Sequence, residues 1–249
     1  MKKLFILFLF MLFSIQTVKA EDISQNYVAA NKYYNSGNYL KAEEEYRKIL
    51  KSGISNGYIF YNLGNSYLKL GQTGLAIANY KKAQNFIPRE QKLKNNINYL
   101  YEKINYEESS LDKTLNFFKL FTFKEVLILF SIFWALIFLL WNLKRTYFHK
   151  SKKINKNINT MILVISPLFL YCLLAISLQI FAYYQNEAII VVEESDVKVS
   201  NNFSDVTLFK VKENQKVNIL SETGDWAKIS FENNKGWINK ASLEKISVL

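Results

Sequence analysis

The chain has 249 residues, half of them hydrophobic, and a formal net charge of +11 at pH 7. Basic residues outnumber acidic ones by 3 to 0 in residues 1–20 and by 8 to 1 in residues 118–183. The counts nearly balance in residues 21–117, at 13 to 10, and in residues 184–249, at 8 to 10. Since neither of these parts carries a strong basic excess, the charge gives no support to nucleic-acid binding.

The residue types that most often perform catalysis are nearly absent. Cys172 is the only cysteine and lies in an apolar run, and His149 is the only histidine and lies among lysines. A disulfide framework within the chain and a thiolate zinc site are therefore excluded. Cys-His, Ser-His-Asp and histidine-metal catalysis are all disfavoured. We expect no enzyme activity, no cofactor and no metal.

Residues 1–20 have the pattern of a secretory signal peptide. Lys2 and Lys3 precede an unbroken apolar run from Leu4 to Phe13. A small-residue ending follows, which predicts cleavage before Glu21. An uncleaved signal anchor is the alternative, and it gives the same topology because the two lysines hold the amino end inside.

A set of small, aromatic and glycine positions occurs twice in the chain at a constant spacing. The first set is Ala30, Tyr33, Gly37, Ala42 and Tyr46, and the second, in the same order, is Gly64, Tyr67, Gly71, Ala76 and Tyr80. The spacing is that of stacked helix-turn-helix units, which repeat every ~34 residues. Gly37 and Gly71 are predicted to end the first helix of each pair in left-handed backbone. Ala42, Gly64 and Ala76 are predicted where two helices cross closely.

The second of these units resembles the tetratricopeptide repeat (TPR). The residues that carry the resemblance are Phe60, Leu63, Gly64, Tyr67, Ala76, Tyr80, Ala83 and Pro88. The first unit departs from the pattern at Asn26, Ala30 and Ile54. We expect an all-α TPR domain over residues 21–106, with repeats at about 23–56 and 57–90 and a capping helix at 91–106.

The resemblance implies a concave protein-binding groove lined by the first helix of each pair. Its predicted residues are Tyr27, Asn31, Tyr34, Tyr61, Asn62, Asn65 and Lys92. Asn31, Asn62 and Lys92 stand where some TPR proteins clamp the C-terminal carboxylate of a partner. A polar groove face without that clamp is the favoured alternative.

Residues 107–119 are predicted to form a linker helix or an amphipathic helix at the membrane surface. Leu111, Leu115, Phe118 and Phe121 recur there at helical spacing, and either kind of helix would place them on one face.

Two long uncharged runs predict two transmembrane helices, at residues 120–143 and 159–184. The first run extends from Val126 to Leu143 and the second from Asn157 to Asn186. Both are long enough to span a bilayer as helices. The connecting residues 144–158 contain six lysines and arginines and no acid. Short loops this basic stay in the cytoplasm, so both soluble parts are predicted to lie outside it.

Short β-branched runs follow in residues 187–249 and predict a small all-β barrel with five strands. These strands are expected at Ala188–Val192, Val206–Val211, Lys216–Leu220, Trp226–Phe231 and Gly236–Ile238. Alternation in the fourth strand places Ala227, Ile229 and Phe231 in the core and Trp226 on the outward side. The outward phase makes Trp226 a candidate ligand contact.

This region resembles the bacterial SH3 (SH3b) domain. The resemblance rests on Gly224-Asp225-Trp226 and on Gly236-Trp237-Ile238, and it extends over residues 187–247. Domains of this family often bind cell-wall peptides or other proteins.

The order of signal peptide, TPR repeats, two spans and SH3b domain resembles the BatE-like proteins of bacterial aerotolerance (Bat) operons. The resemblance implies a two-pass protein of the bacterial inner membrane, with membrane lipid around its spans and both soluble domains in the periplasm. It implies an adaptor in aerotolerance or envelope stress. Its partners would be Bat membrane proteins with von Willebrand factor A domains and a MoxR-type ATPase system. The alternative is a peptidoglycan-binding anchor or sensor that acts through the SH3b domain.

Overall fold

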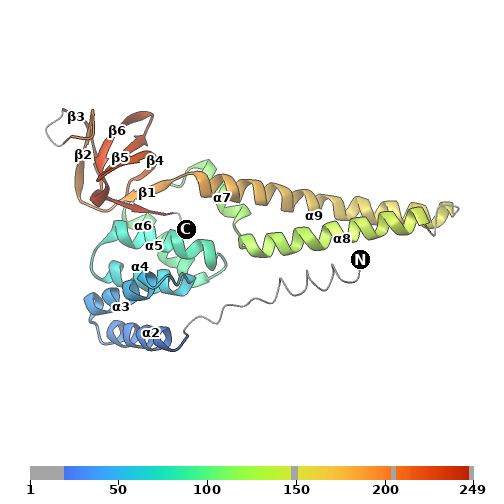
Figure 1. The fold of residues 1–249 in the computed structure, drawn as a ribbon, viewed down its shortest axis with the longest axis horizontal. Coiled ribbons are helices and arrows are strands. Elements are labelled where there is room, and N and C mark those ends of the chain that lie inside the picture. Colours follow the sequence, from blue (N-terminus) through green and yellow to red (C-terminus); the bar gives the residue numbers. More distant parts are fainter. Residues whose placement is uncertain (1–19, 147–150, 203–205, 247–249) are drawn as a thin grey trace. The chain divides into compact units, whose positions relative to one another are not determined.

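The computed structural model describes residues 20–146, 151–202 and 206–246, with side chains from residue 25 onward (Figure 1). The chain divides into two compact units, Met1–Ile54 and Ser55–Leu249. The predicted signal peptide, up to residue 19, and His149 lie outside the described residues.

The first unit contains a helical hairpin made of α2 (Ala20–Asn35) and α3 (Tyr39–Lys51). Gly37 connects the helices with a φ of +79°, the left-handed conformation predicted for it. Asn38 caps α3 by accepting a hydrogen bond from the Lys41 N–H at 3.2 Å. Ala42 is fully buried between the helices, as its small size predicts.

The second unit begins with an equivalent hairpin made of α4 (Gly57–Lys69) and α5 (Thr73–Phe86). Gly71 repeats the φ of +79° found at Gly37. A Cβ atom at Gly64 would lie 2.6 Å from the Tyr80 ring, so a side chain larger than hydrogen would separate the helices. Ala76 and Ala83 are fully buried. The predicted close crossing is therefore confirmed.

The capping helix α6 (Gln91–Lys103) packs on α5 and ends earlier than predicted. It ends because Asn105 adopts a left-handed φ of +51°. The Tyr106 N–H then donates to the Tyr101 carbonyl at 2.9 Å, and the Asn105 N–H donates to the Glu102 carbonyl at 3.3 Å. This pair of bonds is a Schellman motif, which terminates helices.

A short helix, α7 (Ser110–Phe118), connects the repeat to the apolar helices. Ser109 caps it by accepting from the Asp112 N–H at 3.1 Å, and Leu115 is buried. At and just after its last residue, the Gln179 side chain donates to the carbonyls of Phe118 and Phe121, at 2.9 and 3.2 Å. The predicted linker helix exists, and its position at a membrane surface stays a prediction.

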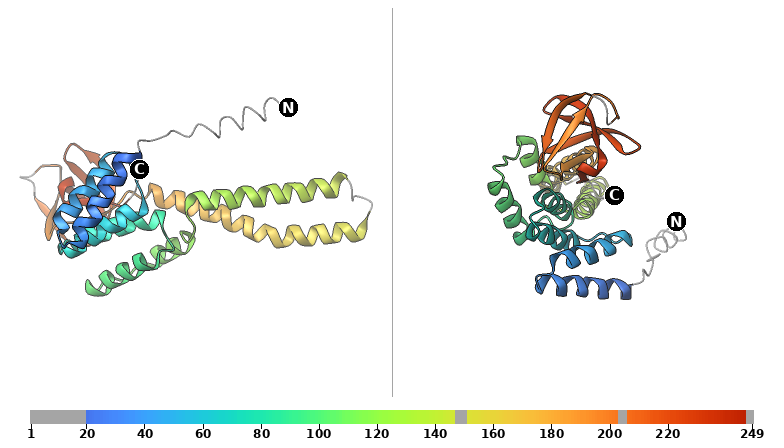
Figure 2. Two further views of the ribbon diagram at one scale, coloured as in Figure 1. Left: turned by 90° about the horizontal axis from the view of Figure 1, so that it is seen from below. Right: turned by 90° about the vertical axis from the view of Figure 1, so that its left-hand side faces the viewer.

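Within the described residues, α8 (Phe123–Thr146) and α9 (Lys152–Tyr184) are the helices long and apolar enough to cross a membrane. They lie side by side as an antiparallel hairpin (Figures 1 and 2). Val126, at the start of α8, packs with Cys172 and Ala175 in the second half of α9. At the other end, Lys144 donates to Asn159 at 2.8 Å. Both helices extend into the predicted basic loop, since α8 continues to Thr146 and α9 begins at Lys152.

The C-terminal part of the second unit is an antiparallel sheet of seven strands. The strands are β1 (Glu187–Ile190), β2 (Glu194–Lys198), β3 (Thr207–Lys212), β4 (Lys216–Thr223), β5 (Trp226–Phe231), β6 (Asn234–Asn239) and β7 (Leu243–Lys245). A short 3-10 helix, η1 (Lys240–Ser242), precedes β7. The order across the sheet is β3-β2-β6-β5-β4-β1-β7. The five predicted strands are present, and β2 and β7 are additional.

The sheet encloses one core, which gives the SH3-like barrel that the sequence predicts. Ile190, Val197, Val211 and Ile238 are fully buried and come from four different strands. Ala227 and Ile229 are also buried, and Phe231 packs against this core. The protein thus combines TPR-type hairpins, two candidate membrane spans and a small barrel.

Candidate protein-interaction site

Each hairpin carries the same hydrogen bond between an asparagine and a tyrosine of its two helices. The Tyr46 hydroxyl donates to Asn31 Oδ1 at 2.6 Å, and the Tyr80 hydroxyl donates to Asn65 Oδ1 at 2.7 Å. Both tyrosines are almost completely buried, and a buried hydroxyl needs a partner. Two predicted groove residues, Asn31 and Asn65, therefore stabilise their own hairpins. The sequence signal for this role is that both bond partners recur at the spacing of the repeat.

In the second unit this hydrogen bond belongs to a larger polar cluster. The Asn96 amide of α6 donates to Asn65 Oδ1 at 2.8 Å and to the Tyr80 hydroxyl at 3.2 Å. The same amide lies 3.5 Å from the Tyr61 hydroxyl, and the Tyr61 ring centroid is 6.0 Å from that of Tyr80. Three helices thus share one network, which positions the half-buried Tyr61 and Asn65 of the predicted groove.

Asn62 and Lys92, the other groove residues of the second unit, lie on α4 and α6. Asn62 is half-buried, and its carbonyl accepts from the Ser66 hydroxyl at 3.0 Å. Lys92 is exposed in the first turn of α6, where its N–H donates to Glu90 Oε1 at 3.3 Å. Asn31 belongs to the first unit, so convergence of all three residues on one carboxylate stays a prediction.

The two groove tyrosines of the first unit are half-buried against other rings. The Tyr27 ring lies edge-on to Tyr46, with centroids 6.2 Å apart. Tyr34 packs in the same manner on Tyr39, at 5.3 Å. Such contacts restrict the rings and lower the conformational entropy that binding would cost.

Trp226 is buried, with only 8% of its surface exposed, so the predicted outward exposure is wrong. It begins β5, where it is paired with Thr223 and Asn239. The chain then turns back at this end of the strand, and the Lys240 N–H donates to the Asp225 carbonyl at 2.8 Å. Strand alternation predicts the side that a residue faces and not whether another segment covers that side.

Trp237 offers more accessible aromatic surface than Trp226. It is half-buried on β6, and the Lys228 ammonium of β5 lies 5.9 Å from its ring centroid. Cation–π contacts of this kind hold a ring and a charge together at a surface. The contact of Trp226 with a ligand stays a prediction, and Trp237 is the better placed tryptophan.

The second repeat and the barrel pack directly on each other, although the sequence treats them as separate domains. Gly74, in the first turn of α5, donates its N–H to Glu213 Oε1 at 2.9 Å. A Cβ atom at Gly74 would lie 2.6 Å from the Ile190 carbonyl oxygen at the end of β1. Lys82 of α5 also forms an ion pair with Glu244 of β7. One face of the repeat is therefore occupied by the barrel.

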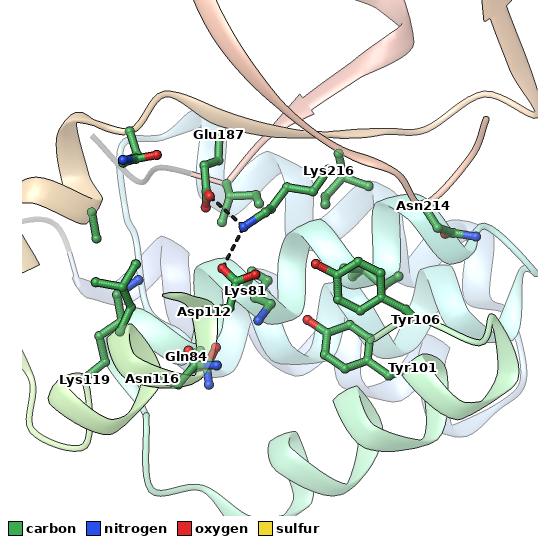
Figure 3. Close-up of a pocket in the computed structure, with 16 residues that line it drawn as sticks. Lys81, Gln84, Tyr101, Tyr106, Asp112, Asn116, Lys119, Glu187, Asn214 and Lys216 are labelled. Carbon is green, nitrogen blue, oxygen red and sulfur yellow. Dashed lines mark hydrogen bonds and ion pairs between the residues drawn. The ribbon is translucent and has the colours of Figure 1, made fainter. Parts of the chain in front are cut away.

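A cluster of charges lies at this junction, around a cavity of about 40 Å³ (Figure 3). Lys216 of β4 bridges Asp112 of α7 and Glu187 of β1, with Nζ–O distances of 2.6 and 2.7 Å. Lys81 of α5 pairs with Glu108 at 2.9 Å. These bridges connect three segments that are far apart in the sequence.

The hydrogen bonds of the cluster outweigh the cost of enclosing its charges. Burial alone would raise the pKa of Asp112, yet the bond to Lys216 holds this pKa below its usual value. Burial alone would lower the pKa of Lys216, yet its two carboxylate partners raise it. Both groups are therefore charged at neutral pH, and the cluster is a structural connection.

Metal-binding geometry is not found in the part of the chain that the structure describes. No group of three or more His, Cys, Asp or Glu residues there is placed to hold a metal ion. Cys172 is buried within α9.

Two segments match known families. Residues 58–89 match the tetratricopeptide repeat, and residues 204–244 match the bacterial SH3 domain. A search of curated proteins gives no match. The protein therefore contains a TPR and an SH3b domain, which are typically non-catalytic modules that bind proteins or peptidoglycan.

Proposed function

We propose that the protein is a membrane-anchored adaptor whose TPR and SH3b modules bind other proteins outside the cytoplasm. The observation that carries the proposal is the direct packing of these two interaction modules at one end of a pair of apolar helices. Within the second unit the barrel packs mainly on α5, whereas the predicted groove residues Tyr61, Asn62 and Lys92 lie on α4 and α6.

The helical hairpin supports a two-pass arrangement in the bacterial inner membrane. Because α8 and α9 are antiparallel, residues 55–122 and 185–246 are attached to the same end of the hairpin. The basic residues between the helices would hold the other end in the cytoplasm. The test is a set of reporter fusions after Glu108, after Leu249 and within residues 147–150. Cytoplasmic behaviour of the first two fusions would contradict the topology.

The module order supports a more specific role, the scaffolding of a Bat-type complex in aerotolerance or envelope stress. The partners would then be Bat membrane proteins with von Willebrand factor A domains and a MoxR-type ATPase system acting from the cytoplasm. Crosslinking in native membranes, followed by purification and mass spectrometry, would identify them. Recovery of no membrane partner would contradict this role.

The groove is best tested without touching Asn31 or Asn65, since their loss would remove the oxygen atoms to which two buried tyrosine hydroxyls donate. Tyr61→Ala with Lys92→Ala removes an aromatic and a cationic contact and should abolish recovery of at least one partner. The matched control is Lys94→Ala with Asn98→Ala, on the side of α6 away from Lys92 by the helical period. Equal recovery with both double variants would exclude this groove as the docking site.

The alternative function is peptidoglycan binding through the SH3b domain, which the family match and the accessible Trp237 favour. Purified sacculi should then retain the protein, and Trp237→Ala should release it. Retention by sacculi without any protein partner would replace the adaptor proposal.

A further inference from the structure

A second, larger cavity lies where the two apolar helices meet the rest of the second unit. Its volume is about 470 Å³, within the range of small-molecule binding sites. Phe121, which precedes α8, and Phe123, the first residue of α8, line it on one side, and Ile180, Tyr183 and Tyr184 line it at the end of α9. If these helices cross a bilayer, the cavity lies at the membrane interface, where aromatic residues concentrate.

The walls of the cavity are held in place by hydrogen bonds, a cation–π contact and an ion pair of the residues that line or surround it. Gln179 holds the segment before α8 through the carbonyls of Phe118 and Phe121. The Arg89 guanidinium lies 5.4 Å from the Phe121 ring centroid, and Arg89 forms a two-bond ion pair with Glu125 at 3.0 and 2.6 Å. The cavity is therefore preformed, which lowers the cost of binding.

Lys119 lines both this cavity and the junction cavity, and its charge is not neutralised by a direct contact. Among the residues that the structure describes, its ammonium has no hydrogen bond or ion pair. The nearby Lys216 is bonded to Asp112 and Glu187 (Figure 3), and Lys81 is paired with Glu108. Burial is the main cause that lowers the pKa of Lys119, and Lys81 adds to it, while the nearby carboxylates of Glu187 and Asp112 act in the opposite direction. Glu187 also lines the cavity, but its carboxylate is bonded to Lys216. A half-buried cation without a direct partner favours an anionic ligand.

We propose that this cavity binds one anionic phospholipid, with an acyl chain along the aromatic wall and a phosphate oxygen on Lys119. The lipid source is favoured over free phosphate because the lining is mostly apolar and continues onto the apolar surface of α8 and α9. The inference rests on the membrane insertion proposed above. Resistance of the protein to alkaline extraction from membranes tests that insertion separately.

The test uses the full chain in detergent and native mass spectrometry with phosphatidylglycerol, phosphatidylcholine and inorganic phosphate as probes. We expect phosphatidylglycerol to bind more tightly than phosphatidylcholine. Lys119→Gln should weaken phosphatidylglycerol binding about tenfold, which corresponds to about 1.4 kcal/mol. The control is Lys124→Gln, an exposed lysine on α8 that does not line the cavity.

A second variant fills the lipid cavity with a large side chain and leaves the Lys119 charge intact. Ala182→Trp should prevent retention of phosphatidylglycerol, and a photoactivatable acyl chain should label Phe123 or Tyr184 only in the wild-type protein. Equal binding of both lipids, unchanged affinity in Lys119→Gln, or competition by inorganic phosphate alone would each overturn the proposal. Loss of binding in Lys124→Gln to the same extent would also overturn it, since a general surface charge would then explain the effect.

Discussion

Gly74→Ala should weaken the junction between the second repeat and the barrel. The new Cβ atom would lie 2.6 Å from the Ile190 carbonyl oxygen and 3.1 Å from the Val191 Cα atom. Both are backbone atoms, so the contact cannot be relieved by rotation of a side chain. Overpacking of this kind costs roughly 1–3 kcal/mol. Relief of this contact would require the start of α5 to move away from the end of β1, and this movement would also strain the hydrogen bond from Gly74 to Glu213.

The same substitution should stabilise α5 itself. Alanine is favoured over glycine in a helix by roughly 0.5–1 kcal/mol. The two effects have opposite signs and act at different places, which separates loss of docking from general unfolding.

Hydrogen exchange on the full chain, followed by mass spectrometry, would measure this difference. A junction weakened by roughly 1–3 kcal/mol opens about 5- to 150-fold more often, so amides at the end of β1 and the start of α5 should exchange faster by that factor. Amides in the middle of α5 should keep their protection. Gln72→Ala, an exposed change close to Gly74 with no side-chain cap to lose, is the matched control. Unchanged exchange at β1 in Gly74→Ala would refute the close approach.

Three further predictions concern the repeat and the charge cluster. Asn65→Ala should destabilise the chain to thermal unfolding by about 1–3 kcal/mol because it removes the acceptor of the buried Tyr80 hydroxyl, whereas Tyr80→Phe should cost about 0.5–1.5 kcal/mol; a larger loss in Tyr80→Phe would contradict this order. Ala76→Leu should lower the unfolding midpoint by overpacking the crossing of α4 and α5, at a cost of roughly 1–3 kcal/mol, and an unchanged midpoint would mean that the crossing is misassigned. The lowered pKa of Asp112 stabilises the fold above the ordinary carboxyl pKa of about 4, and this contribution is lost as pH falls through the folded value. The raised pKa of Lys216 stabilises the fold below about pH 10, and this contribution is lost as pH rises through the folded value. Urea unfolding should therefore show a weaker acid dependence in Asp112→Asn, and parallel curves for the variant and the wild type would contradict it.

The helical repeats could be predicted because their determinants are local and periodic. Gly37 and Gly71 each adopt the same left-handed φ of +79°, a conformation that glycine favours. Ala76 is buried where the repeat spacing places it. Each of these signals depends on residue type and position within one hairpin.

The junction could not be predicted because its contacts join distant segments without any period. Gly74 and Glu213 are 139 residues apart, and a surface carboxylate in a sequence does not indicate its partner. Strand β2 escapes prediction for a related reason. Of its residues only Val197 is fully buried, so it lacks the apolar alternation that identifies a strand.

The roles of the asparagines show a different limit. The sequence assigns Asn31 and Asn65 to a groove because they lie on the first helix of each repeat. Their oxygen atoms instead accept hydrogen bonds from Tyr46 and Tyr80. The position of an asparagine on a helix predicts the helix face on which it lies. Its hydrogen-bond partner depends on whether the second helix places a buried tyrosine hydroxyl within reach of its amide.

The charge cluster at the junction fixes the geometry of docking more than its strength. Lys216 and its two carboxylates lose hydration when they are enclosed, and this loss offsets much of their mutual attraction. Burial of Ile77, Ile189 and Ile246 around the same cavity supplies apolar contact without that cost. A misaligned barrel would retain part of the apolar contact but would leave charges unpaired. The ion pairs therefore select one orientation of the barrel on α5, and this orientation determines which side of the repeat a partner can reach.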